Sequence, residues 1–203
     1  MTQSAPVVNH HAGQAGFAGP IGSAVGLVML VAGRRRDRMV ADLAAVTPSD
    51  HVVDIGCGPG GAAGAAARRG ARVTGVDPAP AMLRLARIFV RERAIRWVEG
   101  ASEELPLPDG TATVAWATAT VHHWPDVTTA LTEIHRVLTP GGRFVTMERD
   151  VAVDATGLAS HGWTEAQART FADLCRAANF TDVRVDRHAA GRRSFWAVRA
   201  VRP

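Results

Sequence analysis

The sequence predicts a single α/β domain built on a mostly parallel sheet, and two observations lead to this prediction. Between residues 51 and 147, short apolar strands alternate with amphipathic helices, the pattern of a parallel sheet covered by helices on both faces. The length of 203 residues fits one domain. A composition of 47% hydrophobic and 21% charged residues excludes collagen-like, low-complexity and disulfide-scaffold proteins.

The predicted elements follow one another in a regular order. Five strands are expected at residues 51–56, 72–76, 95–98, 113–118 and 142–147. Three helices between them are expected at residues 59–69, 80–93 and 126–138. The tail is expected to form one helix and two strands, at residues 164–178, 182–186 and 194–201. The short connection between the last two strands permits a hairpin.

The chain before residue 47 has a different character. Residues 1–15 lack apolar periodicity, so we expect a flexible end and assign no role to His10 or His11. Residues 16–46 are expected to form a helical lid ahead of the domain at 47–203. The uncharged stretch 17–33 is shorter than the roughly 20 apolar residues of a membrane span and contains Pro20. It is therefore read as a cap or lid, with contact to a membrane surface as the alternative.

Cysteine usage bears on the compartment. The chain has two cysteines, Cys57 and Cys175, without the close spacing of a metal site. No basic region precedes the apolar stretch, as it does in a secretory signal. We therefore predict a cytoplasmic location, no disulfide and no metal site.

The strongest local signal is a glycine-rich turn, VVDIGCGPGG, at residues 52–61. It follows a predicted strand and precedes a predicted helix, where backbone N–H groups can bind a ligand. Asp77 ends the next strand, where an acid can accept both hydroxyl hydrogens of a ribose. Asp54 places a carboxylate beside the turn, which disfavours a pyrophosphate and favours a cationic group. The turn therefore favours S-adenosylmethionine over a dinucleotide, with a turn cap as the alternative for Asp54.

Five segments together resemble the class I S-adenosylmethionine-dependent methyltransferases, specifically the type 11 group that acts on small molecules and lipids. In chain order they are VDIGCGPGG, VTGVDPAPAML, EELPLPDG, VHHWPD and ALTEIHRVLTPGGRFV. The resemblance implies a Rossmann-like, doubly wound sheet of seven strands with an antiparallel last strand. It also implies S-adenosylmethionine as the cofactor.

The resemblance further implies which residues contact the cofactor. The glycine loop would surround the methionine part and Asp77 the ribose, with helix core as the alternative for Met82. The usual Gly-Asp-Ala-Glu block reads Gly-Ala-Ser-Glu at residues 100–103, so adenine recognition is expected from backbone groups, Ser102 or Glu103. The implied set is Asp54, Gly56, Cys57, Gly58, Gly60, Asp77, Pro78, Met82, Ala101, Ser102, Glu103 and Thr118.

Methyl transfer from a sulfonium is an in-line displacement in which the protein mainly positions the nucleophile. His122 and His123 follow the fourth strand, at the sheet edge that faces the ligand in open α/β folds. They are candidate general bases, with bracing of the loop as the alternative. Glu148 is a second candidate base. Trp124, His161 and Trp163 are candidates for the acceptor wall, whereas Trp116 is expected in the core.

The expected acceptor is a small apolar or aromatic metabolite or a lipid. One alternative is a protein that binds S-adenosylmethionine or S-adenosylhomocysteine without transfer activity, which the departures at Ala101 and Thr113 favour. An RNA or DNA methyltransferase is favoured only by the net charge of +4. All 23 basic residues are arginines scattered without aromatic interleaving, which is typical of a solvated surface. The sequence leaves the oligomeric state open.

Overall fold

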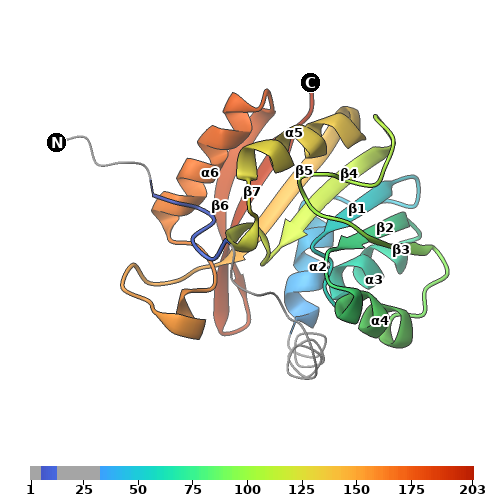
Figure 1. The fold of residues 1–203 in the computed structure, drawn as a ribbon, viewed down its shortest axis with the longest axis horizontal. Helices are drawn as coiled ribbons and strands as arrows, with labels where there is room; N and C mark the ends of the chain where they lie inside the picture. Colours follow the sequence, from blue (N-terminus) through green and yellow to red (C-terminus); the bar gives the residue numbers. More distant parts are fainter. Residues whose placement is uncertain (1–5, 13–32) are drawn as a thin grey trace.

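The computed structural model describes residues 6–12 and 33–203 (Figure 1). The remaining residues, 1–5 and 13–32, include most of the predicted helical lid, which therefore lies outside the described residues. Within the described part, no helix is both long and apolar enough to cross a membrane.

A seven-stranded sheet with the order β3-β2-β1-β4-β5-β7-β6 forms the centre of the molecule. Its strands are β1 (His51–Ile55), β2 (Arg72–Asp77), β3 (Ile95–Glu99), β4 (Ala112–Thr118), β5 (Leu138–Arg149), β6 (Thr181–Ala190) and β7 (Arg193–Val201). The first five strands pair in parallel, whereas β7 runs antiparallel to both β5 and β6. This topology confirms the predicted doubly wound sheet and its antiparallel last strand.

The predicted helices are present, with ends that differ by a few residues. They are α2 (Arg34–Leu43), α3 (Gly61–Ala67), α4 (Pro80–Phe89), α5 (Val127–Val137) and α6 (Glu165–Ala177). Two short 3-10 turns, η1 (Val121–His123) and η2 (Gly157–Ser160), follow β4 and β5. The side chain of Asp126 accepts the N–H groups of Thr128 and Thr129 and so begins α5. A capping box between Thr164 and Gln167 begins α6.

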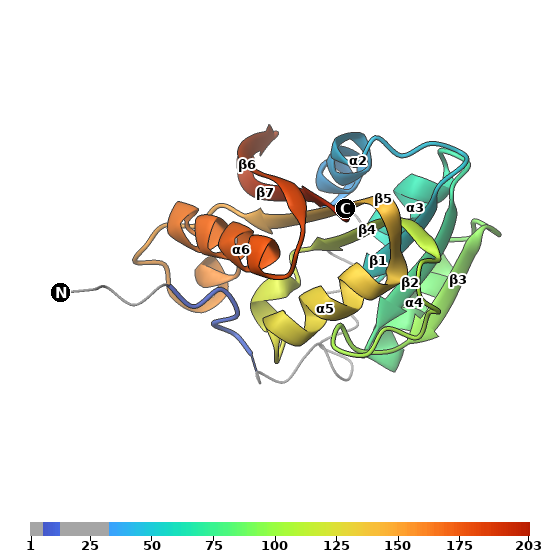
Figure 2. The ribbon, with the colours of Figure 1, turned by 90° about the horizontal axis from the view of Figure 1, so that it is seen from above.

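The helices cover both faces of the sheet (Figure 2). On one face α2 and α3 bury a cluster of alanine and valine side chains together with Trp116 and Met147. On the other face α5 and α6 bury a cluster that includes Phe144, Trp163 and Phe171. Gly61 lets α2 approach α3 closely, because a Cβ added there would lie 2.2 Å from a carboxylate oxygen of Asp37. The helices thus cover both faces of the parallel strands, and a ligand reaches the sheet at the ends of its strands.

Candidate active site

The turn between β1 and α3 contains three glycines with left-handed backbone angles. The φ angles are +66° at Gly56, +53° at Gly58 and +86° at Gly60. A Cβ at Gly56 would lie 2.3 Å from Thr120 Oγ1, and one at Gly60 would lie 2.4 Å from Trp97 Cη2. A Cβ at Gly58 would meet no atom within 4 Å. Packing therefore requires glycine at the two outer positions, whereas Gly58 faces open space that a ligand can fill.

Asp77, at the end of β2, holds this turn in place. One of its oxygens accepts the N–H of Gly58 at 2.8 Å, and the other accepts the N–H of Ala79 at 2.8 Å. Burial raises the pKa of this carboxyl, and the two backbone hydrogen bonds oppose the rise. Each oxygen retains a lone pair, so Asp77 can accept further hydrogen bonds from a ligand while it fixes the turn.

Asp54 is a buried carboxyl at 1% exposure. Within the described part of the chain, neither of its oxygens has a hydrogen-bond partner of normal geometry. Burial raises its pKa to about 7, and the neighbouring carboxylate of Asp37 adds to the rise. Asp37 is itself buried but is paired with Arg36 at 2.9 Å. Burial outweighs the nearby donors Trp116 and Ala63 and the charge of Arg36, all of which lower this pKa.

The other predicted cofactor residues have mixed environments. Ser102 donates to one oxygen of Glu103 at 3.1 Å, and the other oxygen of Glu103 accepts the N–H of Asp126 at 3.1 Å. Met82 is 2% exposed on the buried face of α4, which favours the core-packing alternative. Thr118 and Cys57 are buried, and Ala101 and Pro78 are partly or fully exposed.

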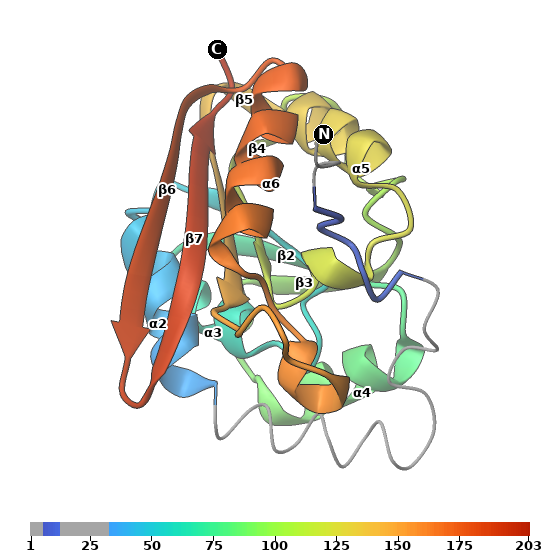
Figure 3. The same ribbon diagram turned by 90° about the vertical axis from the view of Figure 1, so that its left-hand side faces the viewer.

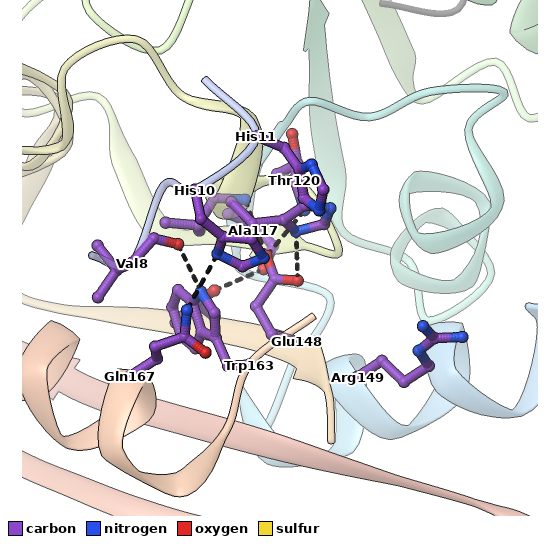
Figure 4. A network of polar contacts seen from close by, with 12 residues as sticks. Val8, His10, His11, Ala117, Thr120, Glu148, Arg149, Trp163 and Gln167 are labelled. Atoms are coloured by element: carbon purple, nitrogen blue, oxygen red, sulfur yellow. Dashed lines mark hydrogen bonds and ion pairs between the residues drawn. The ribbon is translucent and has the colours of Figure 1, made fainter. Parts of the chain in front are cut away.

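A second group of polar residues lies beyond the end of β4. His122, 2% exposed, is hydrogen-bonded through Nδ1 to Oε2 of Glu148 at 2.8 Å. Glu148 Oε1 accepts the backbone N–H groups of Thr120 at 2.9 Å and Val121 at 2.8 Å (Figure 4). Both oxygens of Glu148 are thus engaged, and its side chain is fully buried. Glu148 therefore positions His122 rather than facing an acceptor as the base we expected.

His123 and His161 complete a cluster around His122. The ring of His122 lies 4.1 Å from that of His123 and 5.4 Å from that of His161, between centroids. One ring nitrogen from each of the three lies within 4.8 Å of the others. Burial, together with the neighbouring histidines, lowers the pKa of His123 and of His161 to about 4. These two imidazoles are therefore neutral at physiological pH.

Residues 6–12 cover this cluster. This contact was not expected from the sequence, in which residues 1–15 lack apolar periodicity. The backbone N–H of His11 donates to the carbonyl of His122 at 2.9 Å, and its ring stacks on His161 at 4.2 Å. The indole of Trp163 donates to the carbonyl of Val8 at 2.9 Å (Figure 4). Figure 3 shows this segment, in blue, between α6 and η1. His10 and His11, to which the sequence analysis gave no role, thus lie beside the site.

The tryptophans that we expected to line the acceptor site lie in the core. Trp116 is fully buried within β4, as expected, but Trp124 and Trp163 are also buried, at 4% and 0% exposure. They pack in the core under α5 and α6 rather than lining an open surface.

The open space on this side is instead a pocket rich in arginine. It has a volume of about 190 Å³ and lies between the start of α2, the end of β5 and the turn from β6 to β7. Its charged lining consists of Arg35, Arg36, Arg149 and Arg193, and the neutral ring of His161 also borders it. Arg36 pairs with Asp37, and Arg149 donates to carbonyls of η2, whereas Arg35 and Arg193 have no acidic partner among residues 6–12 and 33–203. The pocket therefore favours a negatively charged group.

Comparison with known proteins assigns the centre of the chain to a family. Residues 53–146 match a family model described as a methyltransferase domain. This part of the chain, a little under half of it, is thus similar to methyltransferase domains. The assignment confirms the resemblance drawn from the five sequence segments, which extend over the same part of the chain.

Two curated relatives and one solved structure illustrate the likeness. A malonyl-[acyl-carrier protein] O-methyltransferase of Serratia marcescens is 38% identical over 95 residues, 47% of this chain and 36% of that protein. A ubiquinone/menaquinone biosynthesis C-methyltransferase of Rubrivivax gelatinosus is 36% identical over 112 residues, covering 55% and 44%. The match thus spans less than half of each relative. A SAM-dependent methyltransferase structure from Aquifex aeolicus shares the fold, with a TM-score of 0.69 and 18% identity over 82% of this chain and 89% of that one.

The residues of the glycine loop fit S-adenosylmethionine, the cofactor that the resemblance of the sequence implies. The open space at Gly58 admits a ligand against the backbone. Asp54 offers a buried carboxyl whose ionised form an ammonium group would stabilise. Asp77 retains acceptor capacity for ribose hydroxyls. The block at residues 100–103 lacks the usual aspartate, so Ser102 and backbone groups are left to contact the adenine.

Proposed function

We propose that this chain is a methyltransferase that moves a methyl group from S-adenosylmethionine to a small-molecule acceptor by in-line displacement. The observation that supports this most directly is the open space at Gly58, flanked by the carboxyls of Asp54 and Asp77, within a methyltransferase domain. The cofactor would supply a methyl group attached to a sulfonium, an electrophile that needs no further activation. The chain's own task is then to hold cofactor and acceptor in line and to exclude water.

The cofactor-facing residues have separate tasks in this proposal. Asp54 ionises when it meets the ammonium group of the methionine part, because the new positive charge offsets the burial of its carboxylate. Asp77 accepts the ribose hydroxyls while it keeps its bonds to Gly58 and Ala79. Ser102 contacts the adenine edge from the loop after β3.

The acceptor is a metabolite or lipid with an apolar or aromatic body, and the arginine pocket favours one that also carries an anionic group. Arg35 and Arg193 provide positive charge without acidic partners in the described part of the chain, and Phe195 provides an apolar wall. The two curated relatives carry names of an O-methyltransferase and a C-methyltransferase, so they do not fix the acceptor atom. We expect the reaction to take place in the cytoplasm.

The apolar stretch 17–33 would cover the acceptor as a lid or contact a membrane surface. Replacement of residues 17–32 by a Gly/Ser linker of equal length tests this, because it leaves the contacts of residues 6–12 with His122 and Trp163 in place. We expect the affinity for an anionic, apolar acceptor to fall while cofactor affinity stays the same. Unchanged acceptor affinity would contradict the lid.

His122 is the better supported of the two candidate bases. Its Nδ1–H donates to Glu148, which fixes the tautomer and leaves Nε2 free of any hydrogen-bond partner among the described residues. His123, in contrast, has a pKa lowered to about 4 and is a weak base at neutral pH. A base acts only where the acceptor must lose a proton.

Transfer of a labelled methyl group to fractionated metabolite, lipid and RNA extracts tests the proposed function. We expect label in the metabolite or lipid fraction with the wild-type chain and none with Asp77→Ala. Cofactor binding without label in any fraction would favour the alternative, a binding protein without transfer activity. Label confined to RNA would contradict the small-molecule assignment. It would also contradict the interpretation of the scattered arginines as a solvated surface.

A further inference from the structure

We propose that His122, His123 and His161 form a binding site for a divalent transition metal ion, with Glu148 as the hydrogen-bond partner behind His122. The three side chains come from η1 and from the residue that follows η2, two turns at the carboxyl end of the parallel strands. Their ring nitrogens lie within 4.8 Å of one another. Imidazole nitrogen is a ligand that suits Zn²⁺, Co²⁺ and Ni²⁺.

The spacing of the three nitrogens is close to what a metal ion requires. Zn–N bonds of about 2.0–2.1 Å in a tetrahedron place neighbouring ligand nitrogens roughly 3.4 Å apart. The ring nitrogens, which lie up to 4.8 Å apart, therefore have to move slightly closer together to bind one ion. His123 and His161 are only half-buried and belong to short turns, so their side chains have room to make this movement.

The contact between Glu148 and His122 is an arrangement that commonly supports a metal ligand. A ligating histidine usually donates its second ring N–H to a carboxylate, which orients the ring and raises its basicity. Here Glu148 Oε1 already accepts two backbone N–H groups, and Oε2 takes the Nδ1–H of His122 at 2.8 Å. Nε2 of His122 is then a lone-pair donor that is buried and without a partner among the described residues. Most buried polar atoms in folded proteins have a hydrogen-bond partner, and a metal ion would supply one to this nitrogen.

The charges around the cluster have both signs, since Glu148 lies behind His122 whereas Arg149 borders the same pocket as His161. Glu148 contributes a buried negative charge directly behind the ligands. Arg149 donates to the carbonyls of Leu158 and Ala159, and its positive charge is among the causes that lower the pKa of His161. The segment that carries His11 lies over the cluster and shields it from solvent.

Three protein ligands leave an open coordination position. If methyl transfer occurs as proposed, a hydroxyl or carboxylate of the acceptor can occupy this position, because Thr120, next to the cluster, also contacts the glycine loop at Gly56. A bound metal ion would lower the pKa of a hydroxyl, which would lose its proton to water and become the nucleophile that takes the methyl group. Nε2 of His122 is then a ligand, and the metal ion takes over the activation otherwise assigned to that base.

Titration of the metal-free full-length chain with Co²⁺ tests the site. We expect one equivalent to bind with the intense visible absorption of four- or five-coordinate cobalt, and Zn²⁺ to displace it. His161→Ala should weaken binding at least about tenfold, and Glu148→Gln about 10–100-fold. His188→Ala, on β6 and away from the cluster, should bind cobalt as the wild type does.

Circular dichroism of His161→Ala and His123→Ala establishes that these surface-turn variants fold. Absence of cobalt absorption in the wild type, or equal affinity in folded His161→Ala and His123→Ala, would overturn the proposed site. The titration contains no S-adenosylmethionine, and cofactor affinity is measured separately in the presence of a chelator. Failure of the metal site is therefore distinguishable from failure of the methyltransferase proposal.

Discussion

The glycine loop and the histidine cluster lie at the same edge of the sheet, yet the chain builds them in opposite ways. The loop is one contiguous segment, residues 54–61, fixed by a single acid from the neighbouring strand, Asp77. The cluster joins four separate segments, at His11, at residues 122–123, at Glu148 and at His161. A contiguous site can be found from the sequence, whereas an assembled site becomes visible only in the fold.

The two regions also differ in which group is left without a partner. In the loop it is a carboxyl, because neither oxygen of Asp54 has a hydrogen-bond partner of normal geometry among the described residues. In the cluster the carboxylate of Glu148 is fully hydrogen-bonded, and the group without a partner is Nε2 of His122. The first arrangement suits an organic cation, and the second suits a metal ion or a proton.

The largest expected effect is a loss of folding stability when the histidine cluster loses Glu148. Glu148→Ala removes the acceptor of two backbone N–H groups and of His122 Nδ1, all of them buried. We expect the free energy of unfolding to fall by about 3 kcal/mol or more, measured by urea denaturation. Glu165→Ala, which breaks an exposed pair with Arg169, should cost less than about 1 kcal/mol. Equal losses would contradict the structural role of Glu148.

Asp77→Ala should have the largest effect on cofactor affinity. The change removes the clamp on Gly58 and the acceptor of the ribose hydroxyls. We expect S-adenosylmethionine affinity to fall about 100-fold in calorimetry, which corresponds to about 2.7 kcal/mol. Cobalt affinity should stay at the wild-type value, since Asp77 does not contact the cluster. An equal loss of affinity for S-adenosylmethionine and for cobalt would show that the two regions are not independent.

Gly58→Ala should have a smaller effect, and Gly110 provides a matched control. Both glycines have φ near +55°, at +53° and +59°, and a Cβ at either meets no atom within 4 Å. Alanine should therefore cost both positions a similar stability, roughly 1 kcal/mol. Gly58→Ala should also weaken cofactor binding about tenfold, because its Cβ enters the proposed ligand space. Cofactor affinity should not change in Gly110→Ala.

The pH dependence of cofactor binding is the smallest expected effect. Asp54 has a pKa of about 7 in the free protein, so it is largely protonated below that pH. An ammonium group favours the carboxylate, and binding below pH 7 must therefore release a proton. We expect affinity to fall by at most about tenfold for each pH unit below 7. Asp54→Asn should remove this slope in calorimetry at pH 6 and 8, and a slope that persists would assign it to another group.

The sequence predicted the fold and the loop because both depend on local patterns. Alternating strands and helices gave the parallel sheet, and the spacing of Gly56, Gly58 and Asp77 gave the cofactor turn. The sequence could not show that His11 and His161, 150 residues apart, stack on each other. It also placed Glu148 as a base and Trp124 on the acceptor wall, because a position at a strand end does not reveal where the side chain points. Alternating apolar and polar residues in a strand show to which face each side chain points. The sequences of β4 and β5 lack this signal near their carboxyl ends, because both faces of the strands are buried there.

Calorimetric titration of the full chain with S-adenosylmethionine, S-adenosylhomocysteine and NAD tests the central claim most directly. The open turn at Gly58 and the buried carboxyl of Asp54 predict one equivalent of either sulfur compound and no binding of NAD, whose pyrophosphate would meet that carboxyl. Binding of NAD alone would contradict the account.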